Sequence, residues 1–360
     1  MRAQAEALLR FAAAATLCAT AAGCSSQRLV ALMPGVINDP RNRTLRRELM
    51  SFGSGEFCKE ATQRGTPLRM SPEEPVVGRF FARDCTYREL DNGDAFVQVR
   101  GEGYAWAQPS GRVGFKAGAS IQYNQDFLLD GSTMYVYFRP RAVQASEFES
   151  LMVERVQQSP LGGLLAGTAQ DIANRVGNQL FSRELARGFT VIRDDNGQTD
   201  FGVGIIEKGG RNPRPFHVEG GERLTLANER AEVQAEQIDF LGPFNVVDEG
   251  RALFLTMSVE GTDAVDVAVW RREAADPWLE SYIRRAGVAQ PAGAPLVADV
   301  IRARTRWERT VPLPKGSYYV VVDHSSTLGS VSPPASRPGV LGPAGVAASI
   351  SYAIQVGEAP

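Results

Sequence analysis

The sequence predicts a mainly β protein with one long helix: an α+β domain at residues 49–215, followed by an antiparallel, jelly-roll-like β-sandwich at residues 222–360. Three observations lead to this prediction. Apolar residues alternate with polar ones in many short segments, which is the pattern of strands with one buried face. Glycine and proline are frequent, with 36 and 21 copies, and many of them separate these segments. A single segment repeats its apolar residues at helical spacing instead.

Composition limits the size and the partners of the protein. The 360 residues are enough for about two ordinary domains. A hydrophobic share of 43% and a charged share of 22% are typical of globular chains that bury a core. The net charge is −2, and lysine and arginine are spread along the whole length. No concentrated basic patch is available for a phosphate backbone, so we expect no nucleic-acid partner.

The first 23 residues have the pattern of a secretory signal peptide. Arg2 and Arg10 flank a polar start, and residues 11–23 are apolar or small. This run is shorter than the roughly 20 helical residues that cross a bilayer. Its length and its small-residue end are those of a cleaved signal sequence. We therefore expect export from the cytoplasm.

The end of this run, Ala21-Ala22-Gly23-Cys24, resembles the lipobox of bacterial lipoproteins. The resemblance implies that the Cys24 thiol receives a diacylglycerol, that the chain is cut before it, and that palmitate-type acyl chains anchor residues 24–48 as a tether on the membrane. Ser25 stands where aspartate would signal inner-membrane retention, so the resemblance implies an outer-membrane protein, periplasmic or surface-exposed. A plain signal peptide with a chance cysteine is the alternative.

Two cysteines remain for the folded body. Of the four in the chain, Cys18 leaves with the signal peptide and Cys24 takes the lipid, which leaves Cys58 and Cys85. An even pair in an oxidising compartment is expected to form a disulfide. Two isolated cysteines provide too few ligands for a metal site. The sequence therefore predicts a structural bridge.

The expected α+β domain begins with strands and ends with a hairpin. Residues 96–106 and 134–139 alternate between apolar and polar side chains. Asn92-Gly93 precedes the first of them and favours a tight turn, because both residue types tolerate positive φ. Residues 190–192 and 201–206 flank a second turn of the same kind. These segments predict antiparallel pairing.

Residues 160–187 form the predicted helix. Leu161, Leu164, Leu165, Ile172 and other apolar residues follow the i, i+3, i+4, i+7 spacing of one helical face. Ser159 provides an N-cap and Pro160 the first turn of the helix, and Gly188 provides the stop at its end. Such a wide apolar stripe must be buried, and the neighbouring sheet is the simplest partner.

Strands alone are expected after residue 213. Alternation is clear at residues 253–259, 265–270, 318–323 and 349–356. A Pro/Gly/Ser-rich stretch at 330–345 precedes the last of these, which has to return across it to pair. Several short strands separated by turns favour a β-sandwich.

Two resemblances concern whole domains. Leu313-Pro-Lys-Gly-Ser-Tyr-Tyr-Val-Val-Val322, in which a turn glycine leads into a Tyr/Val-rich strand, resembles the sandwiches of the bacterial pre-peptidase C-terminal type. That resemblance implies an accessory, non-catalytic module. The order of elements in residues 49–215 is similar to lipid-carrying folds in which a long helix packs into a curved antiparallel sheet.

Catalytic chemistry has few candidates. His217 and His324 are the only histidines. Asp323-His324-Ser325 contains the residue types of a hydrolase triad, but neighbours on a strand point to opposite faces and cannot form that relay. We interpret His324 as a strand-end residue near the surface and His217 as a packing residue. No nucleophile elbow, zinc-binding helix or phosphate loop is present. We expect no enzyme activity and no cofactor.

Acidic clusters at 91–94 and 194–200 could supply oxygen ligands for Ca²⁺. Their glycines lie where a hairpin turn requires them and not where a calcium-binding loop does. We interpret both clusters as turns, without a metal.

Four aromatic residues are candidate ligand-facing side chains: Tyr104, Trp106, Tyr135 and Tyr137. Strand aromatics usually pack, yet exposed rows of them bind sugars and apolar ligands. Two non-catalytic functions stay open, beside a hydrolase without a recognisable motif, against which the scarcity of histidine is the main argument. One is a non-catalytic envelope lipoprotein that binds or scaffolds envelope proteins, glycans or lipid. The other is a lipid or apolar-ligand binding or transfer protein with a pocket under helix 160–187.

Overall fold

The computed structural model describes most of the expected folded body. The described residues are 38–39, 41–42, 57–59, 61–71, 74–107, 111–154, 171, 174, 177–178, 181–193, 199–210, 214–218, 223–289, 291–331 and 347–360. The expected signal peptide, Cys24 and most of the expected tether lie outside them. So do residues 155–170 of the expected helix region, the second acidic turn at 194–198 and the Pro/Gly-rich segment 332–346.

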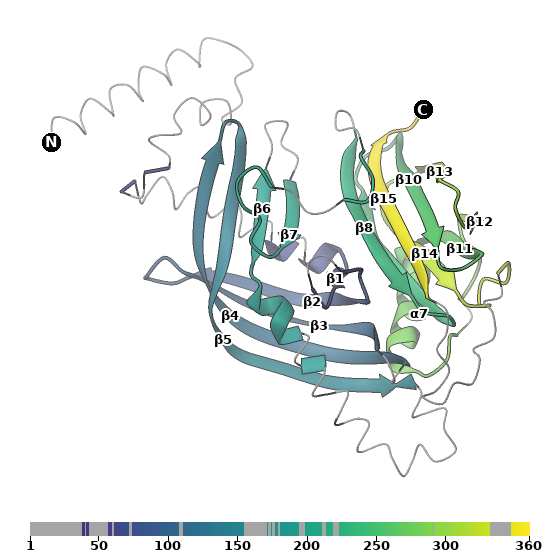
Figure 1. Cartoon of the computed structure of the whole chain (residues 1–360), viewed down its shortest axis with the longest axis horizontal. Helices are drawn as coiled ribbons and strands as arrows, with labels where there is room; N and C mark the ends of the chain where they lie inside the picture. Colours follow the sequence, from purple (N-terminus) through teal and green to yellow (C-terminus); the bar gives the residue numbers. More distant parts are fainter. Residues whose placement is uncertain are drawn as a thin grey trace.

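A seven-stranded antiparallel sheet occupies the first half of the chain, and its strands pair in the order of the sequence (Figure 1). The strands are β1 (Thr66–Leu68), β2 (Gly78–Glu89), β3 (Ala95–Ala107), β4 (Gly111–Asp130), β5 (Thr133–Val153), β6 (Phe189–Arg193) and β7 (Thr199–Val203). β4 and β5 are 20 and 21 residues long, and three register shifts interrupt their pairing. Such bulges bend strands. The sheet is accordingly a curved wall.

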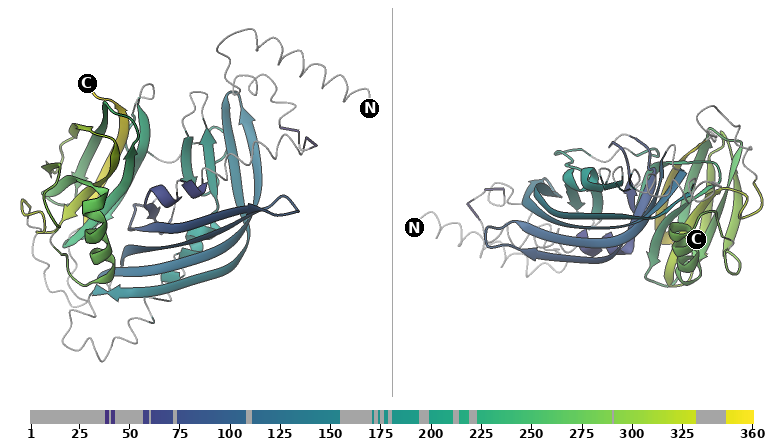
Figure 2. Two further views of the ribbon diagram at one scale, coloured as in Figure 1. Left: turned by 180° about the vertical axis from the view of Figure 1, so that it is seen from behind. Right: turned by 90° about the horizontal axis from the view of Figure 1, so that it is seen from below.

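Two four-stranded antiparallel sheets form a β-sandwich in the second half (Figure 2). Its strands are β8 (Leu224–Val233), β9 (Gln237–Val246), β10 (Arg251–Glu260), β11 (Ala264–Arg271), β12 (Val297–Arg302), β13 (Trp307–Leu313), β14 (Gly316–His324) and β15 (Ala348–Glu358). One sheet has the order β13-β10-β15-β8 and the other has the order β12-β11-β14-β9. The predicted β-sandwich is confirmed.

The strand predictions agree with these elements. The segments predicted from alternation fall within β3, β5, β10, β11, β14 and β15. The last strand, β15, does return to pair: it lies between β10 and β8, in the middle of its sheet. The predicted hairpin at 190–206 corresponds to β6 and β7, although β7 ends at Val203.

The expectation of strands alone after residue 213 was wrong, because the helix α7 spans Arg272–Arg284. It buries Ala275, Trp278, Leu279, Tyr282 and Ile283, which lie at helical spacing. The helix sits between the sandwich and the ends of β3, β4 and β5 (Figure 1). Gly114 of β4 permits this approach, because a Cβ there would lie 1.6 Å from the Ile283 carbonyl oxygen.

The long helix predicted at 160–187 is supported in part. Residues 171, 174, 177, 178 and 181–186 are helical, and Gly188 ends the helix with a φ of +69°. Gly177 rests on the sheet, since a Cβ there would lie 2.0 Å from the Phe148 ring of β5. Asn174 accepts hydrogen bonds of 2.7 Å from the Ser150 backbone and hydroxyl. This helix therefore packs on the seven-stranded sheet.

Two hydrophobic clusters hold the fold together. One lies under the helical segments on the seven-stranded sheet and includes Phe80, Phe115 and Phe138. The other fills the sandwich, and it also takes in Tyr104 and Trp106 from β3. The sheet and the sandwich thus share one continuous core where they meet.

Candidate functional site

A cavity of about 480 Å³ lies where the seven-stranded sheet meets the sandwich. Residues of β1, β2, β3, β4 and β6 form one side, and residues of β8, β9 and β15 form the other. The helical residues near 57–61 and the helix end at 181–188 complete the wall. Segments from both halves of the chain are therefore needed to form it.

Aromatic and aliphatic side chains make up one part of the wall. Phe57 stacks on Phe189 with ring centres 4.2 Å apart, and Phe80 packs against Phe181 at 5.2 Å. Tyr123 adds a further ring, and its burial raises the pKa of its hydroxyl far above the range of ordinary pH. Aliphatic residues complete this part: Ala61, Leu68, Val99, Leu185, Leu226 and Leu241. Such a surface suits an apolar ligand.

The remaining wall is rich in arginine. Its charged members are Arg64, Arg69, Arg79, Arg187, Arg214, Arg230, Glu74, Glu184 and Glu229. Six arginines and three glutamates line this part, and buried Asp239 pairs with Arg79, so the positive charge of the described groups exceeds the negative by two, although the chain as a whole carries −2. Arg69 lies 3.7 Å from Glu229, and Arg187 lies 2.5 Å from Glu184. The cavity is thus apolar in one part and cationic in another.

Arg79 connects this wall to the sandwich. Its guanidinium donates to both carboxylate oxygens of Asp239, at 2.7 and 2.9 Å, and to the Tyr352 hydroxyl at 2.7 Å. The Tyr352 hydroxyl in turn donates to Glu229 at 2.6 Å, and the Tyr104 hydroxyl donates to Asp239 at 2.7 Å. We call Arg79, Asp239, Tyr352, Glu229 and Tyr104 the interface network.

Charge–charge interactions determine the ionisation of this network. Burial alone would lower the pKa of Arg79, but the interactions with Asp239, Tyr352 and Tyr104 together outweigh it and raise that pKa well above its ordinary value. Burial would likewise raise the pKa of Glu229, yet Arg69 and Arg79 bring it below its ordinary value. Arg79 and Glu229 therefore stay charged near neutral pH. The two hydrogen bonds from Arg79 to Asp239 form a bidentate pair, which fixes the geometry of these two side chains.

Arg187 and Glu184 form a second charged pair in the cavity wall. Burial raises the pKa of Glu184, and the hydrogen bond from Arg187 partly offsets that rise. The Arg187 Nη2 atom is buried and has no acceptor among the residues that the structure describes. A buried N–H donor that lacks an acceptor is unsatisfied, and this costs free energy.

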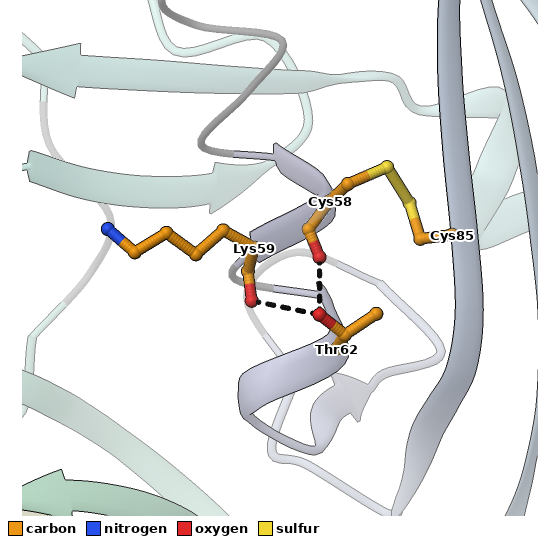
Figure 3. The surroundings of a disulfide bond; sticks show 4 residues. All are labelled: Cys58, Lys59, Thr62 and Cys85. Atoms are coloured by element: carbon orange, nitrogen blue, oxygen red, sulfur yellow. Dashed lines mark hydrogen bonds between the residues drawn. A yellow bond between two sulfur atoms is a disulfide. The ribbon is translucent and has the colours of Figure 1, made fainter.

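The predicted disulfide is present between Cys58 and Cys85 (Figure 3). It ties the helical residues 57–59 to β2, and Thr62 donates to the Cys58 carbonyl at 2.7 Å within the same helical turn. Phe57, next to the bridge, lines the cavity. The bridge therefore holds one part of the cavity wall against the sheet.

Tyr104 and Trp106 pack against protein and do not line the cavity. Both are buried, and the Tyr104 hydroxyl belongs to the interface network. The Trp106 indole donates to the Tyr282 hydroxyl at 3.1 Å, across the contact with α7. Tyr104 and Trp106 lie on the same face of β3, and the sandwich with its helix α7 covers that face.

Tyr135 and Tyr137 likewise lie outside the cavity. They are buried together with Ile192, with Leu128, Ile205 and Ile206 packed against them. The Tyr135 hydroxyl accepts a hydrogen bond of 3.1 Å from the Gly209 backbone. The four candidate aromatics are structural, and the cavity uses other rings.

The interpretation of His324 as a residue near the surface was wrong. His324 is completely buried, and its ring nitrogens lie 3.0 Å from the Val233 carbonyl and 3.1 Å from the Thr262 hydroxyl. Burial lowers its pKa, so it is neutral at ordinary pH. Asp323 instead bonds the Ser325 hydroxyl at 2.5 Å. The three neighbours form no relay, as predicted.

Of the remaining polar candidates, His217 is exposed, so its interpretation as a packing residue was wrong. Asp94 sits in the predicted turn after Gly93, whose φ is +82°, and accepts hydrogen bonds from Asn92, Gln122 and Asn124. Within the described ranges, no three His, Cys, Asp or Glu side chains could hold a metal ion together. No described helix is long and apolar enough to cross a membrane.

Sequence reasoning missed the charged half of the cavity. Its arginines come from segments far apart in the chain, such as Arg64, Arg187 and Arg230, and each has the local pattern of a solvated surface residue. The expected pocket under the helix agrees better with the structure, because Phe181, Leu185 and Gly188 at the helix end line the cavity.

Comparison with known proteins adds little. No family model matches the chain, and no curated protein matches it. One solved chain, from a structure described as "Bacillus endospore appendages form a novel family of disulfide-linked pili", aligns with 41% of this chain and 100% of its own length. The identity is 10% and the TM-score is 0.20. A score this low supports no argument about fold or function.

Proposed function

We propose that the protein is a non-catalytic envelope lipoprotein that binds an apolar or amphipathic small ligand in the cavity between its sheet and its sandwich. The cavity itself is the observation that carries this proposal. Its volume of about 480 Å³ lies within the range of about 300–1,000 Å³ that is usual for small-molecule sites. Its wall combines stacked aromatic rings with polar groups, as such sites usually do, and it carries more charged side chains than most of them.

The sandwich serves as the second wall of the binding site in this proposal. Its eight strands, in the orders β8-β15-β10-β13 and β9-β14-β11-β12, have the arrangement of a jelly roll. Leu226 of β8, Leu241 of β9 and Tyr352 of β15 face the cavity. We infer that the sandwich is an accessory module that closes the site and leaves the helix and the curved sheet to hold the apolar part of the ligand.

The membrane anchor, in this proposal, is an acylated Cys24. Asn38 supports a defined end for the tether, because its side chain exchanges hydrogen bonds of 2.8 and 3.0 Å with the Leu129 backbone near the tip of β4. From residue 24 to residue 38 an extended chain reaches at most about 50 Å, at roughly 3.6 Å per residue. The β4–β5 tip would then face the outer membrane.

Filling the cavity tests ligand binding. The variants Leu68→Trp and Leu185→Trp place an indole at half-buried positions of the cavity wall. We expect either one to weaken the binding of an environment-sensitive naphthylamine dye by about tenfold or more, equivalent to at least about 1.4 kcal/mol. Leu224→Trp is the matched control, because Leu224 lies on β8, is 41% exposed and does not line the cavity. Equal dye binding in all three variants would refute the proposed site.

Replacing Cys24 with serine tests the anchor. The variant lacks the thiol that accepts the diacylglycerol, so we expect it to move from the detergent phase to the aqueous phase in a phase-partition assay. The wild-type protein, expressed in a bacterium with a lipoprotein pathway, should partition into detergent. The Ser25→Ala variant is the control and should behave as wild type. Unchanged partitioning of the Cys24→Ser variant would contradict lipidation.

A further inference from the structure

Arg187 is one of the six arginines of the cavity wall. This residue follows the helix end at 181–186, and its Nη1 atom lies 2.5 Å from Glu184. Its Nη2 atom is buried without an acceptor among the described residues, although the side chain lines the cavity. This unpaired donor has almost no accessible surface of its own, so an anion reaches it only if the Arg187 side chain, which is 19% exposed and lines the cavity, shifts towards the ligand.

Further positive charge lies close to this donor. Arg69 interacts with the carboxylates of both Glu184 and Glu229. The guanidinium groups of Arg69 and Arg187 therefore both lie near the Glu184 carboxylate. The six arginines of the wall outnumber its three glutamates. An excess of positive charge in a cleft attracts an anion.

The apolar part limits the rest of the ligand. The rings of Phe80, Phe181 and Phe189 border the cavity, and Phe181 lies on the same helix end as Arg187. At about 30 Å³ for each water-sized or methylene-sized group, 480 Å³ accommodates about 16 such groups. This is the size of one acyl chain with its head group.

We infer that the cavity binds a single-chain amphiphile with an anionic head group, and that Arg187 binds that head group while Glu184 competes with it. This inference rests on the proposed function and specifies the ligand class of the same site. The chain would lie among the phenylalanine rings, and a carboxylate or phosphate would accept hydrogen bonds from Arg187. Charge-assisted hydrogen bonds of this kind are about twice as strong as neutral ones.

Four probes of equal chain length test the charge preference: decanoate, decyl phosphate, decanol and decyltrimethylammonium. Each displaces the naphthylamine dye from the purified Cys24→Ser chain below its micelle concentration. We expect the two anions to bind at least about tenfold more tightly than the alcohol, and the cation to bind most weakly. The better of the two anions identifies the head group as a carboxylate or a phosphate.

Three variants test the residues. Arg187→Gln should weaken both anions about tenfold and leave decanol unchanged, because only the charge-assisted bonds are lost. Glu184→Gln should tighten the anions, because the competing carboxylate is gone. Arg183→Gln is the matched control: Arg183 lies on the same helix, is exposed and does not line the cavity, so its affinities should equal those of the unmodified chain.

The outcomes separate the two levels of the proposal. If all four probes bind equally, or if Arg187→Gln affects decanol as much as decanoate, the anionic head group is refuted and the apolar site remains. If Glu184→Gln weakens the anions, the competition is refuted. If no probe displaces the dye, or if the dye itself does not bind, the proposed function fails together with this inference.

Discussion

Arg79→Met should lower the free energy of unfolding by about 3–5 kcal/mol, which is the usual effect of removing one partner of a buried ion pair. Asp239 is completely buried, and both of its carboxylate oxygens accept hydrogen bonds from Arg79. Methionine matches much of the arginine volume but leaves that carboxylate without its counter-charge. Urea unfolding followed by tryptophan fluorescence measures the change.

An exposed ion pair at the same interface provides the control. Arg284 of α7 lies 2.5 Å from Glu102 of β3, and the two side chains are 46% and 16% exposed. Arg284→Met should therefore cost no more than about 1 kcal/mol. The double variant Arg79→Met/Asp239→Asn should recover part of the loss, because the unpaired charge is removed. Equal effects of Arg79→Met and Arg284→Met would contradict a stabilising role for the interface network.

The strands that the sequence predicted are those with one buried and one polar face. β10 shows alternation from Leu253 to Val259, and β15 shows it from Ala348 to Tyr352. β4 shows it only in its second half, because residues 112–115 and 117–119 are buried whichever way they point. The helix α7 and the helical segments cover both faces there, so the period of two disappears from the sequence. This explains why no strand was predicted at 111–130.

The helix α7 was missed for a related reason. Its buried residues have correct helical spacing, but Pro277 lies inside the helix and the whole segment is only 13 residues long. Proline inside a helical pattern normally argues for a break. Here Pro277 lies in the second turn. The helix also has no side-chain hydrogen bond at its N-cap, so the usual start signal is absent.

The cavity shows where local patterns stop being informative. The disulfide and the apolar helix face could be predicted, because each depends on residues close in sequence or on cysteine count alone. Asp239 of β9 and Arg79 of β2 are 160 positions apart, and nothing near either of them indicates the other. Their meeting depends on how the sandwich docks on the sheet. Long-range docking of this kind has no signature in a single sequence.

Loss of the disulfide is expected to weaken both the fold and the binding site. The bridge closes a sequence separation of 27 residues, for which the chain-entropy estimate is about 3–4 kcal/mol of stability. The double variant Cys58→Ser/Cys85→Ser should lose that amount in urea unfolding. It should also bind the naphthylamine dye more weakly, because Phe57 beside the bridge stacks on Phe189 in the cavity wall.

Reduction of the wild-type protein provides the matched comparison for this variant. Dithiothreitol breaks the same bond without changing the sequence, so reduced wild type and the double serine variant should share one unfolding midpoint and one dye affinity. The Arg183→Gln chain should respond to the reductant as wild type does, because Arg183 is exposed and does not line the cavity. Loss of stability with unchanged dye affinity would show that the 57–59 segment keeps its place without the bridge. An unfolding midpoint that ignores the reductant would contradict the stabilising role of the bridge itself.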